Sequence, residues 1–129
     1  MWQNDSMPWQ YSQSQGIISR NGQVILGGGY AGNGLGLNNP EAQDQHNVGP
    51  LPQGHYLMTA LVDSPKTGIA TIILDPDPGT EMYGRSAFRI HGDNGRDDQS
   101  ASDGCIVAGH AADRTAIWDT GDHDLEVTA

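Results

Sequence analysis

The chain contains a single cysteine, Cys105, within the stretch SASDGCIV, and a histidine, His91, lies upstream of it in FRIHGDNG. A thiolate is a strong nucleophile, but a free thiol with a pKa of about 8.5 is only a few per cent ionised at neutral pH. A histidine that accepts the thiol proton would activate it. Two interpretations are therefore open: Cys105 is a nucleophile served by His91, or it is a small, inert core residue.

The neighbours of Cys105 favour the nucleophile. Ser102, Asp103 and Gly104 are polar or turn-forming, and the glycine would let a substrate carbonyl approach backbone N–H groups. A helix predicted a few residues downstream would favour a thiolate through its N-terminus. His91 ends the strand-like run SAFRI, where an imidazole can project from a sheet. The order His then Cys argues against papain-like and cell-wall amidase enzymes, which run Cys then His.

Other sites are poorly supported. His91, Asp93, Cys105 and His110 match no zinc spacing, and DNGRDD lacks the downstream glutamate of an EF-hand loop. GGGYAG fits G-x-G-x-x-G, but the following NGLGLNNP is not a helix that could hold a pyrophosphate. We therefore expect no metal, no nucleotide and no other cofactor.

Turn signals divide the first half of the chain. Asn21-Gly22 predicts a type I′ hairpin between strands 17–20 and 23–26. The glycine- and proline-rich segment 27–54 is predicted to be a loop. Aliphatic runs at 55–62 and 68–74 predict two more strands, joined by the turn DSPKTG.

The second half predicts one more strand, a helix and a closing strand. SAFRIH (86–91) leads as a strand into His91, 108–120 is the only plausible helix, and 123–128 reads as the closing strand. The expected fold is β-rich α+β, a mainly antiparallel sheet (sandwich or partial barrel) with one helix after Cys105, in a single domain, 1–129. The inner face of the helix is predicted to hold Ala111, Ala112, Ile117 and Trp118.

Charge and hydropathy exclude several functions. Sixteen acidic against six basic side chains give a formal charge of −10, which disfavours nucleic acid and anionic membrane surfaces. The N-terminus shows neither the basic nor the apolar region of a Sec signal, and no run approaches a membrane span. We expect a protein made in the cytoplasm without a Sec signal, with no membrane insertion.

With these residues in view, HGDNGRDDQSASDGCIV resembles the signature of the L,D-transpeptidase (YkuD-like) catalytic domain: His-Gly, a spacer, then Ser/Thr-His-Gly-Cys-Ile/Val-Arg. Asp103 stands where that family has histidine, and Val107 where it has arginine. Together with WQYSQSQG and GPLPQGHY, the pattern resembles a divergent branch among type VI secretion effectors. These are antibacterial toxins with L,D-carboxypeptidase and L,D-transpeptidase exchange activity on peptidoglycan.

The resemblance implies roles for the site residues. His91 would take the proton of Cys105, which attacks the carbonyl before the terminal D-alanine, and N–H groups of Gly104 and Cys105 would form the oxyanion hole. Gly92 would orient the imidazole through its carbonyl. Asp93 is a second orienting candidate or a turn residue, and Ser102 bonds locally within the turn. Asp103 and either Arg89 or Arg96 would contact the substrate. A structural role is equally open for each arginine.

The resemblance also implies peptidoglycan stem peptides as substrate, a cognate immunity protein, secretion-system partners and action in the periplasm of a target bacterium. Two other interpretations stay open: a cysteine amidase or protease of different specificity, and a non-catalytic wall-binding module. The remaining histidines have no motif support and are read as surface or packing residues: His46, His55, His110 and His123.

Overall fold

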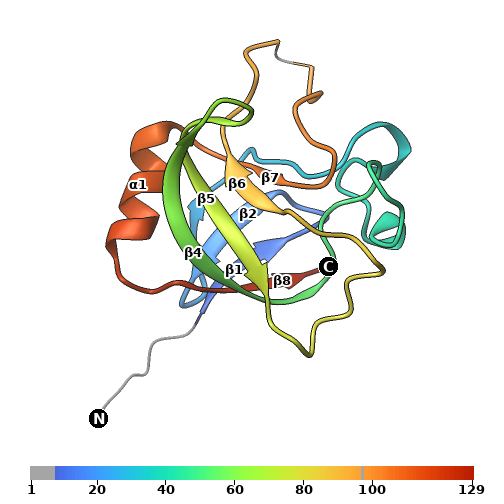
Figure 1. Ribbon diagram of the computed structural model, residues 1–129, viewed down its shortest axis with the longest axis horizontal. Helices are drawn as coiled ribbons and strands as arrows, with labels where there is room; N and C mark the ends of the chain where they lie inside the picture. The colour runs from blue at the N-terminus through green and yellow to red at the C-terminus, as the bar shows by residue number, and fades with distance from the viewer. Residues whose placement is uncertain (1–7, 97) are drawn as a thin grey trace.

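The computed structural model describes residues 8–96 and 98–129, which form an eight-stranded sheet ordered β3-β2-β1-β8-β4-β5-β6-β7 (Figure 1). Neighbouring strands are antiparallel except β1 with β8 and β6 with β7. The predicted β-rich α+β fold is confirmed, although the sheet is mixed and does not close into a barrel. The strands are β1 (Trp9–Ser12), β2 (Ile17–Arg20), β3 (Gln23–Leu26), β4 (Gly54–Ser64), β5 (Gly68–Pro76), β6 (Arg89–His91), β7 (Ile106–Val107) and β8 (Asp124–Thr128).

Local sequence signals set several of these boundaries. Asn21 and Gly22 have φ of 53° and 77°, the positive values that a type I′ turn needs, so the predicted β2–β3 hairpin is confirmed. The strand predicted over 86–91 is shorter, because β6 begins only at Arg89. The reason lies at Ala87, whose φ of 65° is left-handed and cannot continue a ladder.

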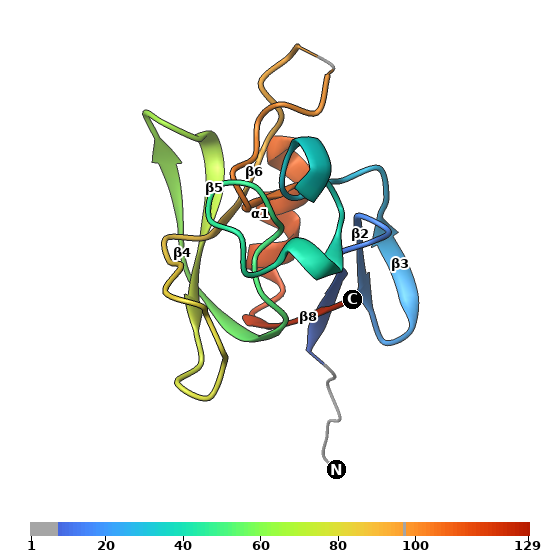
Figure 2. The ribbon, with the colours of Figure 1, turned by 90° about the vertical axis from the view of Figure 1, so that its right-hand side faces the viewer.

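The sheet curls strongly, so that its two ends approach each other (Figure 2). Tyr30, shortly after β3, forms an isolated bridge with Val107 of β7. The segment between β3 and β4 is a loop, as predicted, apart from two short 3-10 helices, η1 (Gly34–Gly36) and η2 (Pro40–Ala42). The apolar side chains enclosed by the curl include Trp9, Tyr11, Ile18, Leu51, Tyr56, Met58, Ile72, Leu74, Phe88, Ile90, Ile106, Leu125 and Val127.

One α-helix, α1 (Ala111–Asp119), packs mainly on β5. Its predicted inner face is only partly correct, since Ile117 is buried but Ala112 is exposed. Arg114 takes the second buried position. Its guanidinium satisfies four carbonyls that would otherwise lack donors, those of Ile69, Ala70, Ala108 and Gly109, at 2.8–3.1 Å.

The sequence predicts no membrane insertion, and the helices bear on that expectation. Within residues 8–96 and 98–129, no helix has the length and apolar character needed to cross a membrane.

Candidate active site

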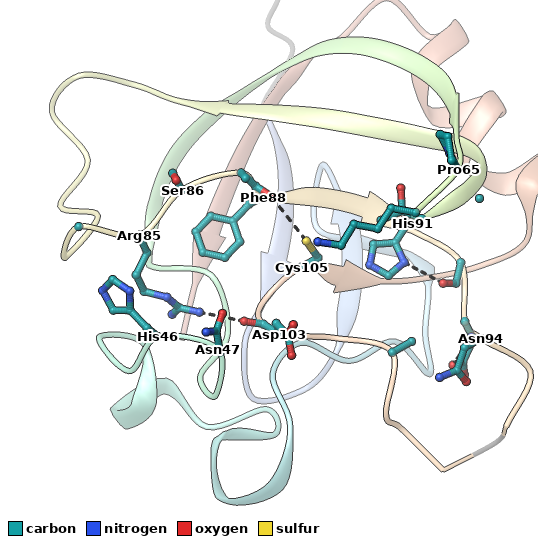
Figure 3. Close-up of a pocket in the computed structure, with 18 residues that line it drawn as sticks. His46, Asn47, Pro65, Arg85, Ser86, Phe88, His91, Asn94, Asp103 and Cys105 are labelled. Carbon is teal, nitrogen blue, oxygen red and sulfur yellow. Dashed lines mark hydrogen bonds between the residues drawn. The ribbon is translucent and has the colours of Figure 1, made fainter.

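An open cleft of about 730 Å³ lies beside the parallel strands β6 and β7, and both His91 and Cys105 line it. Its other walls come from the turn between β4 and β5, from the segment before β6, and from His46 and Asn47 of the long loop. Figure 3 shows Cys105 between the rings of Phe88 and His91 in this view of the cleft. The fold therefore brings the two sequence candidates into one solvent-accessible site.

The strand register explains why these two side chains share the cleft. Ile90 pairs with Ile106, and His91 pairs with Val107. Side chains alternate along a strand, and paired residues point to the same face of a sheet. Cys105 immediately precedes Ile106, so it points to the same face as His91, offset along the strands from the His91–Val107 pair.

The two groups are not hydrogen-bonded to each other, although the sequence predicts that His91 accepts the thiol proton. The Sγ of Cys105 instead donates a long bond to the Ala87 carbonyl, at 3.9 Å. Ala87 precedes β6 in the backbone segment displaced by its left-handed φ, which brings its carbonyl to the thiol. The thiol must turn from this carbonyl before it can deliver a proton to His91.

The His91 imidazole is fixed by its own neighbour. Nδ1 donates to the Gly92 carbonyl at 2.8 Å, so it carries the proton and Nε2 keeps its lone pair. Burial lowers the pKa of His91, and the charges of Arg114 and Arg89 lower it further, against the Gly92 bond and Asp93, which raise it. The ring is therefore neutral at pH 7 and able to act as a base.

The thiol is protonated in the resting protein. Burial raises the pKa of Cys105, against opposing effects of Arg89 and Lys66. The expected help from a helix N-terminus is wrong, because α1 begins only at Ala111 and the strand β7 separates it from the thiol. A neutral thiol of this kind could act as a nucleophile once an imidazole in the same cleft accepts its proton.

Ser102 holds the turn that presents the thiol. Its buried Oγ donates to the Cys105 carbonyl at 2.6 Å and accepts from the N–H groups of Gly32 and Gly104, both at 2.9 Å. The predicted oxyanion donor at Gly104 is therefore engaged elsewhere, which corrects that expectation. The N–H of Cys105 has no partner among the described residues and is the remaining donor of the predicted pair.

Arg85 is a site residue that the sequence did not indicate. It is buried, and it donates to the Gly49 and Asp103 carbonyls at 2.9 and 3.2 Å and, through Nη1, to two more carbonyls of the long loop. Its guanidinium also lies over the Phe88 ring. Gly104, with φ of 140°, allows this packing, since a Cβ there would lie 2.7 Å from Phe88 Cε1.

Asp93, the second candidate for orienting His91, and the two candidate arginines do not all lie in the cleft. Asp93 lines the cleft, but its Oδ1 accepts from the Tyr30 hydroxyl at 2.8 Å and from the Asn94 N–H, and not from His91. Arg89 is outside the cleft lining, with Nη1 on Ser64 Oγ at 3.2 Å. Arg96 is likewise outside it.

Two further charged positions line the cleft. Asp103, a predicted substrate contact, is exposed on its wall, and Lys66 approaches from the β4–β5 turn. His46 also lines the cleft, with Nε2 2.9 Å from the Tyr83 carbonyl, although no motif pointed to it. The other three histidines, His55, His110 and His123, lie outside the lining.

A β-rich fold with a thiol and an imidazole in one cleft defines a candidate cysteine-dependent enzyme. Comparison with known families gives a more specific assignment: the Tlde1 domain matches residues 27–128. The chain therefore belongs to the Tlde1 domain family, whose members are type VI secretion effectors that target peptidoglycan. No curated protein and no solved structure matches the chain.

Proposed function

We propose that this protein is a peptidoglycan L,D-carboxypeptidase and L,D-transpeptidase with Cys105 as nucleophile and His91 as general base. The observation that carries the proposal is the shared face of β6 and β7, where a neutral imidazole tied to Gly92 and a thiol line one cleft. The family supports peptidoglycan as the target, and we propose its stem peptides as the substrate.

In the first step His91 Nε2 takes the thiol proton, and Sγ attacks the carbonyl that joins the third stem residue to the terminal D-alanine. The Sγ–C bond forms while the carbonyl oxygen becomes an oxyanion, to which the Cys105 N–H donates. The C–N bond then breaks, the imidazolium returns its proton to the leaving amine, and D-alanine departs. The product is a thioester on Cys105.

The thioester has three acceptors. Water gives a tripeptide carboxylate, which is carboxypeptidase activity, and a free D-amino acid gives exchange. The amine of a neighbouring stem gives a cross-link. In each case the acceptor N–H or O–H proton passes to His91, and the thiol is regenerated.

We further propose that the protein is delivered by a type VI secretion system and acts in the periplasm of a target bacterium, as its family indicates. A cognate immunity protein in the producing cell would bind across the cleft. Asp103, exposed on the cleft wall, is proposed to contact the substrate.

The test uses purified protein with disaccharide-tetrapeptide, followed by mass spectrometry. Loss of one alanine is expected, and Cys105→Ala should lower the rate by at least about 10³-fold. His91→Gln should do nearly the same, because the two residues act as a unit. Cleavage elsewhere in the stem would indicate an amidase of other specificity, and binding without turnover would indicate a wall-binding module. Either outcome contradicts the proposal.

A further inference from the structure

The cleft contains one basic side chain with no bonding partner in the described structure. Arg85 and Lys66 are the basic side chains that line it. The guanidinium of Arg85 is committed to four backbone carbonyls, whereas the ammonium of Lys66, the only lysine in the chain, bonds to no described residue. Lys66 is thus the cleft cation that is available to a ligand.

The backbone that carries Lys66 is held in place although its side chain is exposed. The N–H groups of Lys66 and Thr67 both donate to Ser64 Oγ at 3.2 Å. The same oxygen accepts from Arg89 of β6, the strand that ends at His91. The turn is therefore anchored to the strand that carries the proposed base, and the ammonium is presented from a fixed point.

The charge around Lys66 makes this position selective. Asp93 and Asp103 line the same cleft, and the chain has a formal charge of −10, so a substrate carboxylate is repelled over most of the site. Lys66 and Cys105 line the same cleft, so the ammonium can reach a group bound next to the reacting carbonyl. An anionic group next to the scissile bond is therefore placed most favourably beside the Lys66 ammonium.

We propose that Lys66 binds the free terminal carboxylate of the substrate's leaving residue, which restricts the enzyme to the last residue of a stem peptide. This inference rests on the proposed function and names the residue that recognises the chain end. The ammonium would form a charge-assisted hydrogen bond with the carboxylate one residue beyond the attacked carbonyl.

The inference is tested by binding, without turnover, in the Cys105→Ala protein. Calorimetry would compare three forms of disaccharide-tetrapeptide whose third residue is meso-diaminopimelate. The first has a free terminal carboxylate, the second a terminal amide, and the third an amide at the side-chain carboxylate of the diaminopimelate. The free acid should bind about tenfold more tightly than the terminal amide. When Lys66→Gln is added to the Cys105→Ala protein, the ratio of the two affinities should fall toward one. When Lys66→Arg is added instead, most of the preference should persist.

The control is Arg96→Gln, which makes the same charge change outside the cleft lining and should leave the preference intact. An unchanged preference in Lys66→Gln, or a loss of affinity only on side-chain amidation, would overturn the inference. Absence of any binding would overturn it too. If the binding pattern appears but the native protein releases no alanine, the proposed function fails and the Lys66 assignment stands.

Discussion

The two sides of the cleft differ in how they are held. On one side, which we call the loop wall (Arg85 and 102–105), Arg85 and Ser102 are buried and tie the turn 102–105 to the long loop. On the other, the hairpin wall (65–68), Pro65, Lys66 and Gly68 are exposed. The difference indicates that the thiol is positioned by satisfied, buried bonds, whereas the proposed substrate contact, Lys66, lies on an exposed turn. Substitutions on the two walls should therefore have different consequences.

The largest effect on folding is expected from Arg85→Met. It leaves four backbone carbonyls without their donor, which should lower the free energy of unfolding by about 3–5 kcal/mol. The loss for Arg85→Lys should lie between zero and the loss for Arg85→Met, since a lysine ammonium cannot reach all four carbonyls. Urea unfolding measures the free energy of unfolding of both variants. A loss below about 1 kcal/mol for Arg85→Met would show that the loop wall is not fixed by these bonds.

Ser102→Ala is expected to have the next largest effect. It removes the acceptor of two buried N–H groups, at a cost of about 2 kcal/mol, and loosens the turn that presents Cys105, so activity should fall as well. The matched control is Ser86→Ala, an exposed serine in the same cleft lining, which should change stability by less than about 0.5 kcal/mol. Equal effects of the two substitutions would contradict the special role of Ser102.

A smaller effect is expected from pH. The pKa of His91 lies below its ordinary 6.5, so the unfolded chain binds a proton that the folded one does not, and stability should fall as pH drops below 6.5. Burial raises the pKa of the Cys105 thiol above its ordinary value, so the unfolded chain loses its proton first, and stability should fall above about pH 8.5.

Urea midpoints against pH, compared with His91→Gln and Cys105→Ala, isolate these two contributions. The two pKa values should also limit the pH range of full activity. Between them kcat/KM should stay constant, because the His91 imidazole and the Cys105 thiol are both neutral there. An acid limb centred above pH 6.5 would show that the imidazole is not buried as described.

The smallest effect is expected on the hairpin wall. Lys66→Gln should change the free energy of unfolding by less than about 0.5 kcal/mol, because the exposed ammonium forms no hydrogen bond or ion pair with a described residue and the turn keeps its Ser64 bonds. A larger loss would mean that Lys66 supports the fold, and the contrast between the walls would disappear.

Much of the fold could be predicted because its signals are local. The positive φ values at Asn21-Gly22, the aliphatic runs of β4 and β5 and the position of His91 at a strand end each depend on a few neighbouring residues. The prediction that His91 and Cys105 share one site came from the motifs around them and their resemblance to the L,D-transpeptidase signature, and both residues line the cleft.

The missed features depend on partners distant in sequence. Arg85 and Arg114 look like ordinary surface arginines until the fold supplies them with backbone carbonyls from distant segments. The engagement of the Gly104 N–H by Ser102, and the approach of Lys66 to Cys105, likewise depend on how the turns are placed. No periodicity or motif encodes such contacts.

The position of β8 has a consequence for biosynthesis. It lies between β1 and β4, so the continuous ladder that joins the β1–β3 group to β4 and β5 runs through residues 124–128. A nascent chain on the ribosome cannot assemble the whole sheet until that late segment has emerged from the exit tunnel. With so many contacts distant along the chain, folding should be slow and should finish only after β8 is available to pair.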